Sequence, residues 1–214
     1  MGEDRYLLVA NGTWPRDEIW QPLVTNAKRI IACDGAAMKC AEMGVKVDAI
    51  IGDMDSIDAA YLETLKKEQS TLLVPRTDQT TNDLVKAMYW AIEQGAEHLD
   101  LMAVEGGDSG HQFASMMALC EVPFQSQIHT NTSTVELLQN GVYTNASLPR
   151  GTVFSLFAIG EVKGVTIKGS EWDLSSVELL PSTRGLHNAT ASDTLEITWN
   201  SGTILLFLNH RSLL

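Results

Sequence analysis

The two halves of the 214-residue chain have different hydrophobic patterns, and this difference constrains the fold most. From residue 6 to residue 129, short apolar runs alternate with stretches of helical period, which is typical of parallel strands joined by helices. After about residue 135 the helical period stops, and short β-rich runs punctuated by glycine follow. The sequence therefore predicts an α/β domain over residues 1–135, with a mostly parallel sheet covered by helices on both faces, and an all-β sandwich over residues 136–214.

The expected elements follow from these patterns, with glycine or proline at several of their boundaries. In the first half we expect strands at 6–10, 29–33, 49–51, 71–74, 99–103 and 127–129, and helices at 15–26, 36–43, 58–69, 83–94 and 112–120. In the second half we expect strands at 142–144, 152–158, 162–168, 194–199 and 203–208. Residues 105–110 are expected to form a glycine-rich loop.

The chain is acidic, with 27 Asp and Glu residues against 15 Lys and Arg residues. A protein that binds nucleic acid needs a basic face for the phosphate backbone, so no nucleic-acid partner is expected. The sequence has no long apolar stretch, so neither a signal peptide nor a membrane-spanning helix is expected. Cys33, Cys40 and Cys120 form no Cys-x-x-Cys motif and are expected to be reduced, which favours a cytoplasmic protein.

A pair of aspartates follows the expected strand at 49–51, in the sequence Gly-Asp-Met-Asp-Ser. In an extended backbone Asp53 and Asp55 point to the same side, and the carboxyl end of a parallel strand is where α/β proteins bind ligands. Two adjacent carboxylates repel each other, so a bound cation is the usual reason to keep them together. The alternative is that Asp55, Ser56 or Asp58 caps the next helix. Capping needs only one such residue, and the group as a whole favours a metal site.

Acidic residues also follow two other expected strands. Asp34 ends the strand at 29–33, and Asp78 and Asp83 follow the strand at 71–74. If the strands are parallel, these turns meet at one edge of the sheet, and the carboxylates suit Mg²⁺ held together with substrate phosphates. Asp83 alone could instead be a favourable charge at a helix N-terminus. The sequence has neither a Walker-type loop nor a Gly-x-Gly-x-x-Gly motif, so a nucleotide would be held in another way.

Three acidic segments of the first half resemble, in order and spacing, the acidic motifs of thiamine pyrophosphokinases. They are Ala32–Ala37, Gly52–Ser56 and Asp78–Leu84. Three segments of the second half resemble the β-domain signature of the same family: Lys163–Thr166, Lys168–Leu174 and Gly185–Asn188. The resemblance covers nearly the whole chain.

The resemblance implies transfer of a diphosphate group from ATP to the hydroxyl of thiamine, which gives thiamine diphosphate and AMP, with Mg²⁺ as cofactor. The residues that it places in the catalytic metal site are Asp34, Asp53, Asp55 and Asp83. The expected ATP contacts are Asn11, Asp78, Gln79 and Lys86. The expected thiamine contacts are Trp172, Ser182, Asn188, His111 and Gln112. The resemblance also implies a homodimer, with each active site formed by the α/β domain of one subunit and the β domain of the other.

Trp172 suits this function because thiamine carries a permanent positive charge on its thiazolium ring. The face of an indole ring attracts such a cation. The acidic neighbours Glu171 and Asp173 must stay near water, which is unusual for a core position. The alternative is that Trp172 belongs to the core of the sandwich.

One segment departs from the family pattern, which has Arg-x-Asp followed by His or Gln after a Gly-Gly pair. Here Asp108 stands where the arginine is expected and Gly110 where the aspartate is expected, followed by His111 and Gln112. Two other functions therefore stay open. One is a diphosphokinase for another heterocyclic alcohol, such as a pterin. The other is a non-catalytic thiamine or nucleotide sensor, against which the complete set of acidic residues argues.

Overall fold

The structure is a computed structural model that describes residues 4–78, 80–139 and 141–210. The chain divides into two compact units, Met1–Asn131 and Thr132–Leu214. The expected domain boundary after residue 135 falls inside a strand, β7 (Ser133–Leu138). The expected mixture of helices and strands is confirmed, with all five helices of the described residues in the first unit.

The sheet of the first unit is parallel throughout and has the strand order β4-β3-β2-β1-β5-β6. The strands are β1 (Arg5–Val9), β2 (Arg29–Cys33), β3 (Ala49–Gly52), β4 (Leu72–Pro75), β5 (His98–Met102) and β6 (Ser126–His129). The chain moves outward from β1 to β4 and then returns to place β5 on the other side of β1. In such a sheet the loops after β1 and β5 diverge, and ligands bind at this switch point.

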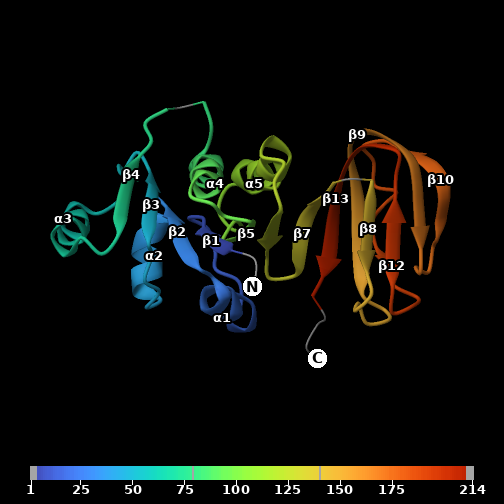
Figure 1. The fold of residues 1–214 in the computed structure, drawn as a ribbon, viewed down its shortest axis with the longest axis horizontal. Coiled ribbons are helices and arrows are strands. Elements are labelled where there is room, and N and C mark those ends of the chain that lie inside the picture. Colours follow the sequence, from blue (N-terminus) through green and yellow to red (C-terminus); the bar gives the residue numbers. More distant parts are fainter. Residues whose placement is uncertain (1–3, 79, 140, 211–214) are drawn as a thin grey trace. The chain divides into compact units, whose positions relative to one another are not determined.

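Helices lie on both faces of this sheet. They are α1 (Asp17–Asn26), α2 (Ala36–Glu42), α3 (Ala59–Glu68), α4 (Asp83–Glu93) and α5 (Ser109–Glu121). Figure 1 shows α4 and α5 on one face and α1 and α2 on the other. An apolar core lies under α1 and α2, with Leu7, Ile50 and Cys40 fully buried in it.

Two helices begin two or more residues away from the expected start. The first starts at Asp17 rather than residue 15, and it contains Pro22. The last starts at Ser109 rather than residue 112, because the side chain of Asp108 accepts a hydrogen bond from the backbone N–H of His111 and caps the helix. The glycine-rich loop is therefore shorter than predicted.

In the described part of the second unit (132–139 and 141–210), every regular element is a strand, and the strands pair antiparallel. Besides β7 they are β8 (Val142–Asn145), β9 (Val153–Lys168), β10 (Leu174–Leu179), β11 (Asn188–Ala189), β12 (Leu195–Thr198) and β13 (Ser201–Asn209). The first part of β9 pairs with β11 and most of β13, and its last part pairs with β10 and β12. The core of this unit takes buried side chains from both groups, including Phe154, Leu206, Val165 and Ile197.

The prediction of separate strands at 152–158 and 162–168 is wrong, because β9 is one strand of 16 residues. Gly160 and Gly164 lie inside it, and its register against β13 shifts between Ile159 and Lys163. The glycines accommodate an irregularity in the strand rather than ending it. The sequence analysis also missed β7, β10 and β11. Among the described residues, no helix is long and apolar enough to cross a membrane.

Candidate active site

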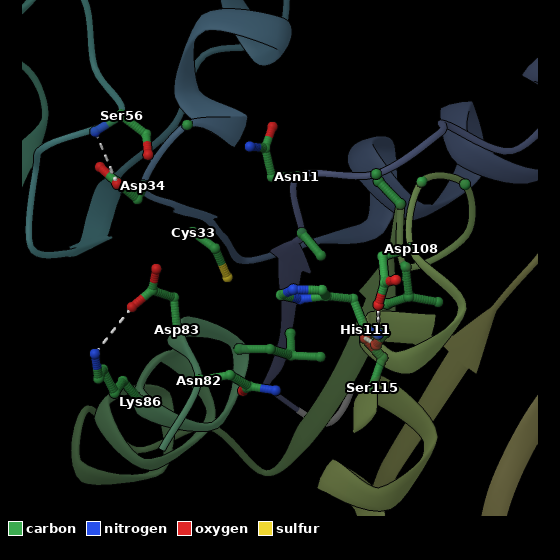
Figure 2. Close-up of a pocket in the computed structure, with 18 of the residues that line it drawn as sticks. Asn11, Cys33, Asp34, Ser56, Asn82, Asp83, Lys86, Asp108, His111 and Ser115 are labelled. Atoms are coloured by element: carbon green, nitrogen blue, oxygen red, sulfur yellow. Dashed lines mark hydrogen bonds and ion pairs between the residues drawn. The ribbon is translucent and has the colours of Figure 1, made fainter. Parts of the chain in front are cut away.

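A cleft of about 490 Å³ lies at the carboxyl ends of the parallel strands, where the sheet topology predicts a ligand site. The loops after β1, β2, β3 and β5 line it, together with the first turns of α4 and α5 (Figure 2). Six of the predicted site residues line this cleft: Asn11, Asp34, Asp53, Asp83, Lys86 and His111.

Three predicted metal ligands come together at the ends of β2 and β3. Asp34, Asp53 and Asp55 each offer a carboxylate oxygen, and these oxygens lie within 4.8 Å of one another. Asp34 is buried, Asp53 is half-buried and Asp55 is exposed, so the group opens toward solvent. A divalent cation that keeps several waters suits such a half-open set of oxygen ligands.

The hydrogen bonding of the Asp34 carboxylate indicates where a cation would bind in this group of three aspartates. Its Oδ2 atom accepts a hydrogen bond of 3.2 Å from the backbone N–H of Ser56, whereas its buried Oδ1 atom has no hydrogen-bond partner among the described residues. Burial raises the pKa of this carboxyl group, although hydrogen bonds from Ser56 oppose the shift. A cation would satisfy the Oδ1 atom and favour the ionised form, so the residues present fit a bound metal.

The turn that brings Asp53 and Asp55 together is not the extended backbone that we predicted. The backbone N–H of Asp55 donates to Asp53 Oδ1 over 3.3 Å, and Met54 has a positive φ of 68°. Gly52 precedes the turn, and a Cβ atom at this position would lie 2.6 Å from the Asp34 Cβ atom. A tight turn therefore gathers the carboxylates, and it passes so close to Asp34 that only glycine fits.

Asp58 takes the capping role that the sequence left open between three residues. Its Oδ1 atom accepts hydrogen bonds of 3.0 Å from the backbone N–H groups of Ala60 and Tyr61, at the start of α3. Asp55 and Ser56 instead bond to each other, with Ser56 Oγ donating to Asp55 Oδ1 over 3.0 Å. The Asp53–Asp55 pair is therefore not explained by helix capping.

Asp83 stands apart from the three clustered carboxylates. It forms an ion pair of 3.0 Å with Lys86, whose side chain is only 8% exposed. Figure 2 shows this pair on the α4 side of the cleft. Asn82 caps α4 by accepting a hydrogen bond from the backbone N–H of Val85, so Asp83 is free to act as a first-turn charge as well as a site residue.

Two expected contacts of the first unit, Asp78 and Gln112, do not line the cleft. Asp78 is exposed and folds back on Thr80, whose hydroxyl and backbone N–H donate to it and lower its pKa. Gln112 is in the first turn of α5, beside His111. Gln79 lies outside the described residues.

Asp108 lines the cleft although the sequence analysis did not predict it as a site residue. It caps α5, which explains why an aspartate is stable at the position where the family has an arginine. Among the described residues that line the cleft, Lys86 is the one lysine or arginine. Other lining residues that we did not predict come from the same loops and helix starts: Cys33, Ser56, Thr81, Asn82, Gly106, Gly107 and Ser115.

The second unit has a hollow of its own, with a volume of about 340 Å³. Apolar residues such as Phe154, Leu174 and Val177 line it, and Trp172 and Asn188 contribute to its wall. Trp172 is 61% exposed, so the alternative that it belongs to the core is wrong.

Asn188 fixes the backbone of Trp172 from both sides. The Trp172 N–H donates to Asn188 Oδ1 over 3.2 Å, and Asn188 Nδ2 donates to the Trp172 carbonyl over 2.9 Å. Ser182 is not among the lining residues, and its hydroxyl oxygen accepts a hydrogen bond from the backbone N–H of Arg184 over 3.4 Å. The Trp172 ring therefore lies at the wall of the hollow on a backbone that Asn188 holds in place.

Comparisons with known proteins identify both the family and the fold of the chain. A family model described as "Thiamin pyrophosphokinase, catalytic domain" matches residues 20–131, slightly more than half of the chain. No curated protein sequence matches the chain significantly. Thiamine pyrophosphokinase from Bacillus subtilis has a similar fold, with a TM-score of 0.82 and 16% identity over 97% of this chain and 99% of that one.

Two further solved structures share the fold. A protein from Lactobacillus plantarum has a TM-score of 0.82 and 20% identity over 97% of this chain and 99% of its own. Thiamin pyrophosphokinase from Candida albicans has a TM-score of 0.76 and 16% identity over 97% of this chain and 89% of its own. At such low sequence identities, the structural similarity shows a shared fold and nothing more. The match to the family model shows the family.

Proposed function

The chain belongs to the thiamin pyrophosphokinase family of enzymes, and from this premise we propose that it transfers a diphosphate group from ATP to the hydroxyl of thiamine, giving thiamine diphosphate and AMP. The observation that carries the proposal is the group of Asp34, Asp53 and Asp55, in which one buried carboxylate oxygen has no partner among the described residues. This is the arrangement expected of residues that share a divalent cation with substrate phosphates.

The three clustered carboxylates and Asp83 are the proposed catalytic residues. Mg²⁺ is the proposed cofactor, and it would supply charge stabilisation for the phosphate oxygens as the diphosphate group moves. The turn at Asp53–Asp55 holds two ligands in place before substrate arrives, which saves reorganisation during the reaction. Asp83 orients the Lys86 ammonium, which is nearly buried and suited to a phosphate oxygen.

Two side chains at other parts of the cleft are proposed substrate contacts. Asn11 lies in the loop after β1 and is a proposed ATP contact. His111 lies at the start of α5, and Figure 2 shows its ring directed into the cleft. We assign His111 to contact with thiamine, as the family resemblance implies.

The hollow of the second unit is the proposed site for the ring system of thiamine. Its exposed Trp172 ring offers a face for a cationic thiazolium or for an aminopyrimidine, and its apolar lining suits flat rings. Asn188 acts on this site by holding the Trp172 backbone.

We further propose a homodimer in which each active site combines the first unit of one subunit with the second unit of the other, as the family resemblance implies. A small all-β unit of this size buries a modest core and is often completed by association. Light scattering should give the mass of a dimer at micromolar concentration, and a fully active monomer would contradict this.

We also propose a cytoplasmic location, because all three cysteines are free thiols.

The direct test is AMP formation from ATP and Mg²⁺ in the presence of thiamine and, separately, of other heterocyclic alcohols that include a pterin. We expect AMP with thiamine and little with the others. AMP formation with a pterin alcohol alone would favour the second kind of diphosphokinase. Thiamine binding without any AMP would favour a sensor.

A further inference from the structure

A closed ring of hydrogen bonds joins the three loops that follow β1, β5 and β6. Glu105, in the loop after β5, is its centre. The Glu105 carbonyl accepts a hydrogen bond of 2.6 Å from the backbone N–H of Thr13, and its carboxylate Oε2 accepts one of 2.7 Å from the backbone N–H of Asn131. The ring closes where Asn131 Oδ1 accepts a hydrogen bond of 2.9 Å from the backbone N–H of Arg16.

Two of these loops also interlock sterically. A Cβ atom on Gly12 would clash with the carbonyl oxygens of Ala103 and Glu105, and a Cβ atom on Gly106 would clash with the Thr13 hydroxyl. Both glycines line the cleft. A displacement of Glu105 must therefore displace the cleft wall on both sides of the switch point between β1 and β5.

The Glu105 side chain has no role in the proposed chemistry, and it does not line the cleft. It is half-buried, and its carboxylate accepts a hydrogen bond from a backbone N–H group. Because the acceptor is charged, this hydrogen bond is stronger than one between neutral groups. An exposed glutamate that served only solubility would not be placed in this way.

We propose that Glu105 is a positioning residue that holds the Gly12 and Gly106 walls of the cleft at the spacing a nucleotide requires. This inference rests on the proposed function for the identity of the ligand. The ring itself is independent of that function. Asn131 acts through the same ring, because its side chain anchors Arg16 at the start of α1.

The test compares Glu105→Ala, which removes the acceptor, with Glu105→Gln, whose amide oxygen keeps one. Glu121→Ala is the matched control, since Glu121 is exposed at the end of α5. We expect Glu105→Ala to raise the KM for ATP about tenfold and to change kcat less than about threefold. This pattern is expected because the variant would weaken nucleotide binding equally in the ground state and in the transition state. Glu105→Gln should stay within about threefold of the wild type, and Glu121→Ala should not differ from it.

Hydrogen exchange separates a failure of this inference from a failure of the proposed function. The amides of Thr13 and Asn131 should exchange faster in Glu105→Ala than in the wild type or in Glu105→Gln, whether or not the wild type forms AMP. Unchanged exchange at both amides would overturn the inference. So would a Glu105→Ala variant that melts at a lower temperature but keeps the wild-type KM for ATP, or a Glu105→Gln variant as impaired as Glu105→Ala.

Discussion

The cleft of the first unit and the hollow of the second are built from different material. Carboxylates, glycines and one nearly buried lysine line the cleft, and they come from loops at strand ends and from the first turn of α4. Apolar side chains from β9 and β10 line much of the hollow, with the exposed Trp172 ring beside them. The cleft therefore suits a polyphosphate with its metal, and the hollow suits a flat, cationic ring. In the proposed function, each unit would therefore bind one of the two substrates.

The largest expected effect concerns the cleft carboxylates. Asp53→Asn should lower kcat at least about a hundredfold, because it removes the charge of a proposed metal ligand that would stabilise the transition state. Steady-state assays at saturating Mg²⁺ check this. The fold should persist, and the melting temperature of the metal-free protein should hold or rise because a like-charge repulsion is lost.

Asp58→Asn is the matched control, since asparagine also caps a helix and the change removes a carboxylate from the same loop. It should leave kcat within about twofold of the wild type, because asparagine keeps the cap and residue 58 does not line the cleft. Near-normal activity of both Asp53→Asn and Asp55→Asn would contradict the proposal that these carboxylates form the catalytic metal site.

A second prediction contrasts the cleft carboxylates with a carboxylate that already has partners. Asp100 in β5 accepts two hydrogen bonds of 2.9 Å from Arg5, and His129 lies 2.8 Å from it. Burial opposes its ionisation, but the hydrogen bonds with His129 and Arg5, together with the His98 ring 3.4 Å away, outweigh burial and hold its pKa well below the usual range. Asp100→Asn should lower the free energy of unfolding at pH 7 by about 2 kcal/mol.

The pH dependence of this loss has a definite sign. A depressed pKa in the folded state stabilises the protein above the pKa of the unfolded chain, about 3.9, and the stabilisation is lost as the pH falls toward the folded value. The difference between wild type and Asp100→Asn should therefore be full at pH 7 and shrink below about pH 4. Chemical denaturation at several pH values measures it, and a difference that grows on acidification would contradict the assignment.

A third prediction addresses the hollow. Trp172→Ala should raise the KM for thiamine about three- to thirtyfold, the range of a cation–π contact, and leave the KM for ATP nearly unchanged. Trp172→Phe should recover part of the loss. Leu180→Ala removes another exposed apolar side chain of the same unit and is the control. An unchanged KM for thiamine in Trp172→Ala would place the ring system elsewhere.

The smallest effect is expected at Asn188. Asn188→Ala keeps the indole ring but removes the two hydrogen bonds that hold its backbone, so the KM for thiamine should rise about two- to fivefold. Kinetics of the single and double variants with Trp172→Ala check this. If Asn188 acts through Trp172, the double variant should be no worse than Trp172→Ala alone, and additive losses would contradict that route.

The sequence predicted much of the first unit because its signals are local. Apolar runs, caps and acidic strand ends located the sheet, its helices and the carboxylates of the cleft. The reason given for Asp53 and Asp55 was wrong, since their approach depends on the positive φ of Met54 rather than on an extended strand. The bonds of Glu105 to Thr13 and Asn131 join residues far apart in the sequence, and no local pattern announces them.

The second unit was harder to predict because its strands depend on partners distant in the chain. Glycines at 160 and 164 suggested a strand end where β9 continues. Six residues at 174–179 form β10 against the last part of β9, and neither their alternation nor their composition marked them as a strand. The exposed position of Trp172 was predicted better, because its charged neighbours constrain it directly.

The most direct test of the division between cleft and hollow is calorimetric titration of two ligands, each alone, into three proteins. The ligands are thiamine and a Mg²⁺-bound, non-hydrolysable ATP analogue, and the proteins are the wild type, Asp53→Asn and Trp172→Ala. The account predicts that Asp53→Asn loses affinity for the nucleotide and keeps its affinity for thiamine, and that Trp172→Ala does the reverse. Equal losses for both ligands in either variant would contradict it.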